Sequence, residues 1–186
     1  MAKKNRPPSQ LVNPRENFYF YAAVILLLFA GLYLRLDGFG RSLEYDELWT
    51  IDYFTSGPFN LIFTELALPN NHPINSLLTR WLFRDTGDIL LLRLPALACG
   101  IGIIILTGMI TYRLTLSRPA LLGIMILTVT SMPLIRYSQA ARGYSLQLFF
   151  LLLTAWCALT ATSSHPGRWR SGIGIFIGGT MSILTI

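Results

Sequence analysis

Two adjacent carboxylates, Asp46 and Glu47, are the first residues of this chain whose position suggests chemistry. They follow the first long apolar segment, and if Asp46 starts a helix, Glu47 is turned about 100° away from it. The two carboxylates would then have different tasks, or only one would have a task. The functional interpretation is that Asp46 is a general base that deprotonates an acceptor hydroxyl. The alternative is a pair of solvated acids at a helix N-terminus, stabilised by the helix dipole.

Three arginines could bind an anion. Arg93 opens the second long apolar segment, and Arg136 and Arg142 lie in the turn between the third and the fourth. A guanidinium can form two parallel hydrogen bonds to a phosphate, so these side chains suit a phosphate leaving group. The alternative for Arg93 is a cation that extends from a helix end to the membrane surface. The arginines and Asp46 form one site only if the helices bring them together.

A fourth candidate is His72, which precedes Pro73 in a turn and helix-start signal. A lone histidine in a loop is more often a plain polar residue than a functional one. The sequence has no Ser/His/Asp arrangement, no nucleotide-binding loop and no cluster with metal-ligand spacing. Cys99 and Cys157 lie in apolar segments, which favours two small buried side chains over a disulfide or a metal site. The sequence therefore identifies no cofactor.

The elements that must position these residues are membrane helices. Of the 186 residues, 53% are hydrophobic and only 13% are charged, whereas a soluble domain has about 25% charged residues. The composition predicts an all-α, polytopic membrane protein. The net charge of +6 arises from basic residues near the ends of apolar segments. This pattern indicates membrane orientation and not nucleic-acid binding.

Five apolar segments predict about five transmembrane helices, over residues 18–36, 89–112, 119–135, 145–162 and 172–186. The first ends in Arg35-Leu36-Asp37 and not in a small-residue cleavage site, which favours a retained helix over a signal peptide. The last is shorter than the about 20 residues that a crossing needs, so we expect a truncated chain or a fragment. The predicted organisation is a basic cytoplasmic tail, 1–17, followed by one transmembrane module, 18–186.

The distribution of charge predicts that the N-terminus lies inside. On that topology the cytoplasmic segments carry one acid, Glu16, together with the basic residues Lys3, Lys4, Arg6, Arg15, Arg113, Arg118, Arg168 and Arg170. The outer segments carry the other acids, which are Asp37, Glu44, Asp46, Glu47, Asp52, Glu65, Asp85 and Asp88. The positive-inside rule then places the loop of residues 37–88 on the outer face of a multi-pass protein, expected in the cell membrane.

That loop is predicted to contain three short helices, over Asp46–Phe54, Phe59–Leu68 and Pro73–Phe83. In the third, apolar residues recur at helical spacing along one face. Such helices are too short to cross a bilayer. We expect them to lie along the outer interface with their apolar faces towards the lipid.

Four short motifs follow one another in a definite order. They are Asp46-Glu47 after the first membrane helix, His72-Pro73 at a helix start, Arg93-Leu94-Pro95 at the start of the next helix, and Tyr-Ser-Gln-x-x-Arg-x-Tyr over residues 137–144. This order resembles the N-terminal part of the GT-C membrane glycosyltransferases. Within them it is most similar to the protein O-mannosyltransferase and aminoarabinose-transferase-like group, a glycosyltransferase family 39-like branch. The resemblance covers about residues 18–162.

The resemblance implies a transferase that takes a sugar from a polyprenyl-phosphate carrier on the outer face. The acceptor would be a hydroxyl group of a protein, a lipid or a glycan. Asp46 would be the catalytic acid–base residue, with Glu47 beside it. Arg93, Arg142 and His72 would lie near the phosphate of the donor.

The sequence departs from the family pattern at two positions. Ile74 stands where relatives often have a second proline, and Ala140 stands where they often have a glutamate. Relatives are also longer, so parts of the donor and acceptor sites are expected outside these residues. The alternative is a non-enzymatic membrane subunit, a transporter fragment or an inactive remnant. Transporters place ionisable groups near the bilayer midplane, whereas here the charges lie at helix ends and in loops.

Overall fold

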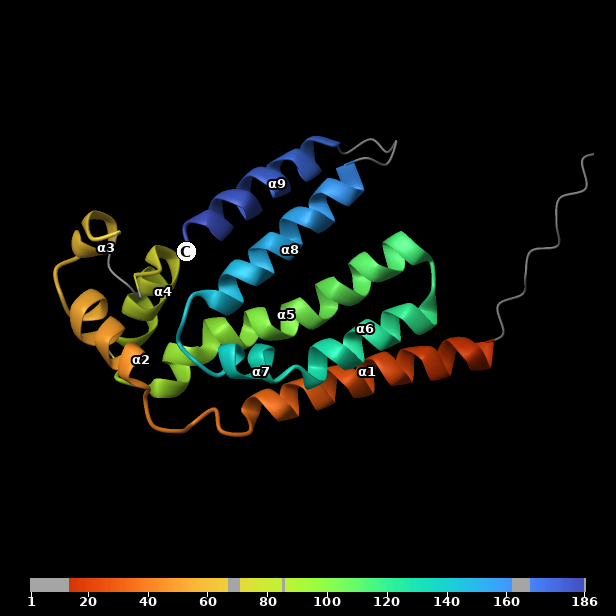
Figure 1. The fold of residues 1–186 in the computed structure, drawn as a ribbon, viewed down its shortest axis with the longest axis horizontal. Coiled ribbons are helices and arrows are strands. Elements are labelled where there is room, and N and C mark those ends of the chain that lie inside the picture. The colour runs from red at the N-terminus through yellow and green to blue at the C-terminus, as the bar shows by residue number, and fades with distance from the viewer. Residues whose placement is uncertain (1–13, 67–70, 85, 162–167, 186) are drawn as a thin grey trace, which may run out of the picture.

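The structure, a computed structural model, describes residues 14–66, 71–84, 86–161 and 168–185 (Figure 1). All regular secondary structure in these ranges is helical, which confirms the predicted all-α class. Helix α1 begins at Pro14, inside the predicted tail of residues 1–17, and residues 1–13 of that tail lie outside the described ranges.

Among the described residues, three helices are long and apolar enough to cross a membrane: α1 (Pro14–Leu36), α5 (Ile89–Thr115) and α8 (Tyr144–Ala161). A fourth crossing results if the bent pair α6 (Arg118–Thr130) and α7 (Met132–Ser138) counts as one span. Helix α9 (Arg168–Ile183) has 16 residues, or about 24 Å at 1.5 Å per residue. A bilayer core is about 30 Å thick. The prediction of five crossings and of an inside N-terminus therefore stays a prediction.

The long helices lie side by side and alternate in direction (Figure 1). Helix α5 is central, because it contacts α1, α4, α6, α7 and α8, and α9 packs along α8. Ile104, Met125 and Val129 form an apolar core between α5 and α6, and side chains of α1 pack against it. The alternation brings the residue 37–88 loop, the turn of residues 139–143 and the C-terminal end of α9 to one end of the bundle. We call this the loop end.

The loop contains short helices close to those predicted. Helix α2 (Tyr45–Thr50) continues into a π-helical turn, η1 (Ile51–Thr55), so helix covers the predicted 46–54. Helix α4 (Pro73–Phe83) has the predicted bounds. Helix α3 (Leu61–Thr64) is shorter than the predicted 59–68, of which residues 67 and 68 lie outside the described ranges. An interfacial position for these helices stays a prediction.

The third apolar segment is not the single helix that was predicted over residues 119–135. It divides at Ser131, where α6 and α7 meet at an angle of 62°, and α7 extends to Ser138. The physical reason is Pro133 in the first turn of α7. Its nitrogen has no hydrogen to donate to the carbonyl of Val129, and in a continuous helix its ring would clash with that carbonyl, so the backbone leaves the helical conformation at Ser131.

Arg35, near the end of α1, is fully buried and fills this break. Its Nη2 donates to the carbonyl of Thr128 (3.3 Å) and its Nε donates to Oγ of Ser138 (3.2 Å). Nη1 donates back to the carbonyl of Gly31 (3.1 Å). Thr128 belongs to the last turn of α6, where carbonyls have no donor within the helix. One guanidinium therefore satisfies α6 and holds α7 against α1, a role that the sequence did not indicate.

Gly100 of α5 makes room for this contact, and its replacement tests it. A Cβ atom at Gly100 would lie 2.6 Å from Cβ of Ser138. Gly100→Ala is therefore expected to displace α7 from Arg35 and to lower the free energy of unfolding by about 1–3 kcal/mol, as overpacking does. Thermal unfolding in detergent micelles measures the change.

Gly123→Ala is the matched control, because no atom lies within 4 Å of a Cβ at this helical position. Alanine is favoured over glycine inside a helix by about 0.5–1 kcal/mol, so the melting temperature should stay or rise slightly. Equal melting temperatures for the two variants would contradict the close packing of α5 on α7.

Candidate active site

A buried ion pair joins Arg93 of α5 to Glu47 of α2. Arg93 Nε donates to Oε1 of Glu47 (2.9 Å) and Nη2 donates to Oε2 (2.6 Å), so the pair is bidentate. Both side chains are inaccessible to solvent. A bidentate arginine–carboxylate pair is among the strongest polar contacts in proteins and has a defined geometry. The pair therefore fixes the orientation of α2 on the start of α5.

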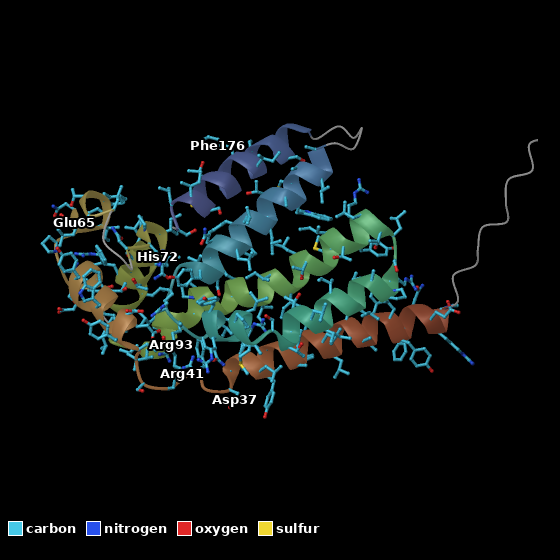
Figure 2. The ribbon with its side chains drawn as sticks, in the orientation of Figure 1. Asp37, Arg41, Glu65, His72, Arg93 and Phe176 are labelled. Carbon is cyan, nitrogen blue, oxygen red and sulfur yellow. The ribbon has the colours of Figure 1, made fainter. Side chains whose placement is uncertain are left out.

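The remaining N–H groups of Arg93 are also engaged by the protein. Nη1 donates to the carbonyls of Phe39 (2.7 Å) and Arg41 (2.9 Å), and Nη2 donates to the carbonyl of Ser42 (3.2 Å). All five guanidinium donors thus have partners, and the chain of residues 39–42 wraps around this side chain. Figure 2 shows Arg93 and Arg41 close together at the loop end. In this conformation Arg93 has no donor to offer to a phosphate.

Glu47 connects a third segment to the pair. Besides Arg93, its Oε1 accepts from the backbone N–H of Ala141 (2.7 Å) and its Oε2 accepts from that of Glu44 (2.9 Å). Burial by itself raises the pKa of Glu47. The Arg93 side chain, the two backbone N–H groups and the positive charge of Arg93 together overcome burial and lower the pKa below its ordinary value. Glu47 is therefore an ionised structural anchor, fully hydrogen-bonded in the interior.

Asp46 has a different environment, as the predicted 100° turn between the two residues requires. Its side chain is 33% exposed, and its Oδ2 contacts Nη2 of Arg142, which lies in the turn between α7 and α8. The structure thus brings together Asp46 and Arg142, two predicted site residues that are far apart in the chain. A partly exposed carboxylate next to a cation is able to exchange a proton with a bound molecule.

Two residues that the sequence did not single out, Arg41 and Glu44, complete the charged cluster. Glu44 Oε2 lies 3.8 Å from Nη2 of Arg142, and Glu44 Oε1 lies 3.9 Å from Nη2 of Arg41. Nη2 of Arg41 also donates to Oε1 of Gln139 (3.3 Å). In the sequence they are marked only as two opposite charges, three residues apart, shortly before Asp46.

His72 has a packing role at the start of α4. Its Nδ1 lies 2.8 Å from the carbonyl of Thr185, and its ring centroid lies 5.3 Å from that of Tyr144 in an edge-to-face contact. A Cβ at Gly143 would lie 2.6 Å from Cγ of His72, so glycine permits this approach. These contacts place His72 where α4, the 139–143 turn and the end of α9 meet. Its predicted proximity to a donor phosphate stays a prediction.

Arg136, the remaining candidate for anion binding, does not join the charged cluster by any contact described above. Arg136 has an exposed side chain on α7. Within the described ranges, no group of three or more His, Cys, Asp or Glu residues is arranged to hold a metal ion.

Glu47→Gln tests the anchoring role of the ion pair. The substitution leaves the charge of Arg93 buried without a counter-charge, which costs about 3–5 kcal/mol when a buried pair loses one partner. Because folding lowers the pKa of Glu47 from its ordinary 4.5, the contribution of the pair is complete above that pH and is lost as the pH falls through the folded value. Thermal unfolding between about pH 7 and pH 3 should show an acid-dependent loss in the parent protein that Glu47→Gln largely lacks.

Asp52→Asn, at an exposed acid of the same loop, serves as the control. It is expected to keep both the stability and the acid dependence of the parent. A Glu47→Gln protein as stable as the parent at neutral pH would contradict the anchoring role.

Comparisons of the chain with protein-family models, with curated proteins and with solved structures found no match.

Proposed function

We propose that the loop end is the catalytic face of a glycosyltransferase that moves a sugar from a polyprenyl-phosphate carrier to a hydroxyl acceptor. The observation that carries this proposal is the contrast between two neighbouring carboxylates. Glu47 is buried and immobilised by Arg93, whereas Asp46 is partly exposed and meets Arg142. A reachable carboxylate on a rigid support, next to an arginine, supplies both a base and a partner for a phosphate.

The proposed step is a single displacement at the anomeric carbon of the donor. Asp46 accepts the proton of the acceptor hydroxyl, and the acceptor oxygen forms the new bond to that carbon. The bond from the carbon to the phosphate oxygen breaks, and its electron pair leaves with the polyprenyl phosphate. Arg142 stabilises the negative charge that accumulates on the phosphate. The proton on Asp46 then passes to water.

The contact between Arg142 and Asp46 fits this sequence of events. Without a donor, each side chain neutralises the other. A donor phosphate that attracts Arg142 would release Asp46 towards the acceptor. Activation of the acceptor would therefore depend on the presence of the donor, which limits deprotonation when no sugar can be transferred.

Arg93 supports this site indirectly in the proposed enzyme. It holds Glu47, and Glu47 in turn holds the backbone of Ala141, the residue before Arg142. His72 similarly supports the turn from the other side through Tyr144. We assign both residues to positioning and not to direct contact with the phosphate.

The lipid part of the donor has a surface close to Asp46. A largely apolar groove along α2 and η1 is lined by Tyr45, Leu48, Trp49 and Ile51, together with the polar residues Asp52 and Ser56. An isoprenoid chain that approaches from the bilayer would contact these side chains while its phosphate reaches the charged cluster. The basic residues Arg15, Arg113 and Arg118 at the opposite end of the bundle favour the cytoplasmic side for that end, and therefore the outer face of the cell membrane for the loop end.

The alternative is a non-enzymatic membrane subunit, in which the charged cluster only fastens the loop to the bundle. The complete internal satisfaction of Arg93 and Glu47 favours such a structural role for that pair. It does not require a partly exposed Asp46. The two functions differ in what the loss of the Asp46 charge would do.

Asp46→Asn should reduce sugar transfer by about 10²–10⁴-fold, the usual contribution of a general base. Transfer is measured in membranes that contain the protein in its full genomic reading frame, with a panel of polyprenyl-phosphate sugars as donors. Asp37→Asn, at an exposed acid of the same loop, should transfer as the parent does. Transfer that survives in Asp46→Asn would exclude Asp46 as the base. No transfer from any donor would favour the structural subunit.

A further inference from the structure

A groove lies between α1, α5 and α6, towards the end of the bundle that is opposite the loop end. It has a volume of about 240 Å³, and its walls are aliphatic, aromatic and methionine side chains, among them Phe20, Val24, Leu28, Ile105, Met109 and Leu121. From Phe20 to Leu28 it follows α1 for eight residues, or about 12 Å at 1.5 Å per residue. Its shape and lining therefore suit a hydrocarbon chain.

Arg118, the first residue of α6, holds a positive charge at the mouth of this groove. Its guanidinium carbon lies 4.9 Å from the centroid of the Phe20 ring, which is part of the groove wall. Its Nη2 donates to Oδ1 of Asn17 (2.7 Å), near the start of α1. The cation–π contact and the hydrogen bond together hold the guanidinium beside the groove.

Arg118 has donors to offer to a further acceptor. Within the described ranges its guanidinium forms one hydrogen bond, the one to Asn17, whereas a guanidinium has five N–H groups. Its side chain is partly exposed. A phosphate group can accept two parallel hydrogen bonds from such a fork. Arg118 thus differs from Arg93, whose five donors all bind groups of the protein.

The charges at this end of the three helices also favour an anion. Arg15 at the start of α1 and Arg113 near the end of α5 are exposed, and both helix ends lie beside the start of α6 (Figure 1). Glu16 is the one acid among the described residues of these three helix ends, against three cations. The positive-inside rule predicts the cytoplasmic side for this end, where the lipid surface is negatively charged.

We propose that the groove binds an anionic phospholipid, with one acyl chain between α1, α5 and α6 and the phosphate at Arg118. An apolar groove with cations at its mouth is complementary to a molecule that has a hydrocarbon chain and an anionic headgroup. Basic pockets between membrane helices on the cytoplasmic side recognise anionic lipids in this way. The site lies at the other end of the bundle from Asp46, so the inference does not depend on the proposed transferase.

A bound phospholipid would join the three helices at this end. Its headgroup would contact α6, and its chain would contact α1 and α5 along the groove. A ligand that binds only the folded protein raises the free energy of unfolding. An anionic phospholipid should therefore raise the melting temperature more than a zwitterionic one with the same acyl chains.

The test is binding of phosphatidylglycerol to the purified full chain in detergent, measured by native mass spectrometry, with phosphatidylcholine of the same acyl chains as the reference lipid. The protein should bind phosphatidylglycerol several-fold more tightly. Arg118→Gln should weaken phosphatidylglycerol binding by roughly fivefold, the effect of one cation on an anionic lipid, and should change phosphatidylcholine binding less. Arg84→Gln, at an exposed arginine just after α4 at the loop end, should bind both lipids as the parent does.

Ile105→Trp tests the position of the acyl chain. Ile105 lines the groove and is 41% exposed, so an indole at this position would occupy part of the space of the chain. The loss of contact with about two methylene groups should weaken the binding of both lipids by roughly tenfold. Ile126→Trp is the matched control, because Ile126 of α6 is 48% exposed and does not line the groove. It should bind as the parent does.

Equal binding of the two lipids would overturn the proposal, as would phosphatidylglycerol binding that is unchanged in Arg118→Gln. Binding that is unchanged in Ile105→Trp would exclude the acyl chain from the groove. A dimer in detergent that Ile105→Trp dissociates would assign the groove to a second copy of the chain and overturn the lipid site. If Arg118→Gln does not fold, the salt dependence of the parent decides. A preference for phosphatidylglycerol that declines with rising salt supports the site, and a preference that is indifferent to salt contradicts it.

Discussion

The ion pair between Arg93 and Glu47 is the contact on which the loop end depends. A guanidinium and a carboxylate removed from water are stable only when their hydrogen-bonding groups find partners. The chain meets this requirement by bringing three segments to the pair: residues 39–42, the first turn of α2 and the backbone at Ala141. Because the buried charges need all of these partners, the pair is stable in one arrangement of the segments. It therefore specifies how the loop, α5 and the 139–143 turn meet.

This constraint separates the tasks of neighbouring residues. Glu47 points into the interior and anchors, so Asp46 must point away from it, where it remains partly exposed and meets Arg142. The arginines differ in the same way. All five donors of Arg93 bind groups of the protein, whereas the Nε donors of Arg41 and Arg142 have no partner among the described residues. The inner pair of Arg93 and Glu47 is rigid, and the outer charged side chains are partly exposed. A site that binds an anion without losing its shape needs both.

The turn that carries Arg142 is held from a second direction. Arg35 attaches α7 to α1 at the break in the third apolar segment, and the side-chain amide of Gln139 donates to the carbonyls of Leu34 and Asp37 at the end of α1. The break itself, caused by Pro133, turns the chain by 62° and directs α7 across the bundle. Contacts from α1 and from Glu47 together leave the turn little freedom, and the position of Arg142 follows from both.

The sequence by itself determined the helical class, the bounds of α4 and the approximate bounds of α1, α5 and α8, because apolar runs and helix-start residues act over a few neighbouring positions. It also determined that Asp46 and Glu47 face different ways, since that follows from helical geometry. Only the tertiary structure decided that Glu47 binds Arg93, 46 residues away, and the N–H of Ala141, 94 residues away. It likewise decided that Arg41 joins Arg142 and that Arg35 fills a helix break. Such pairings depend on which helices pack together, and no local pattern of residue types encodes that choice.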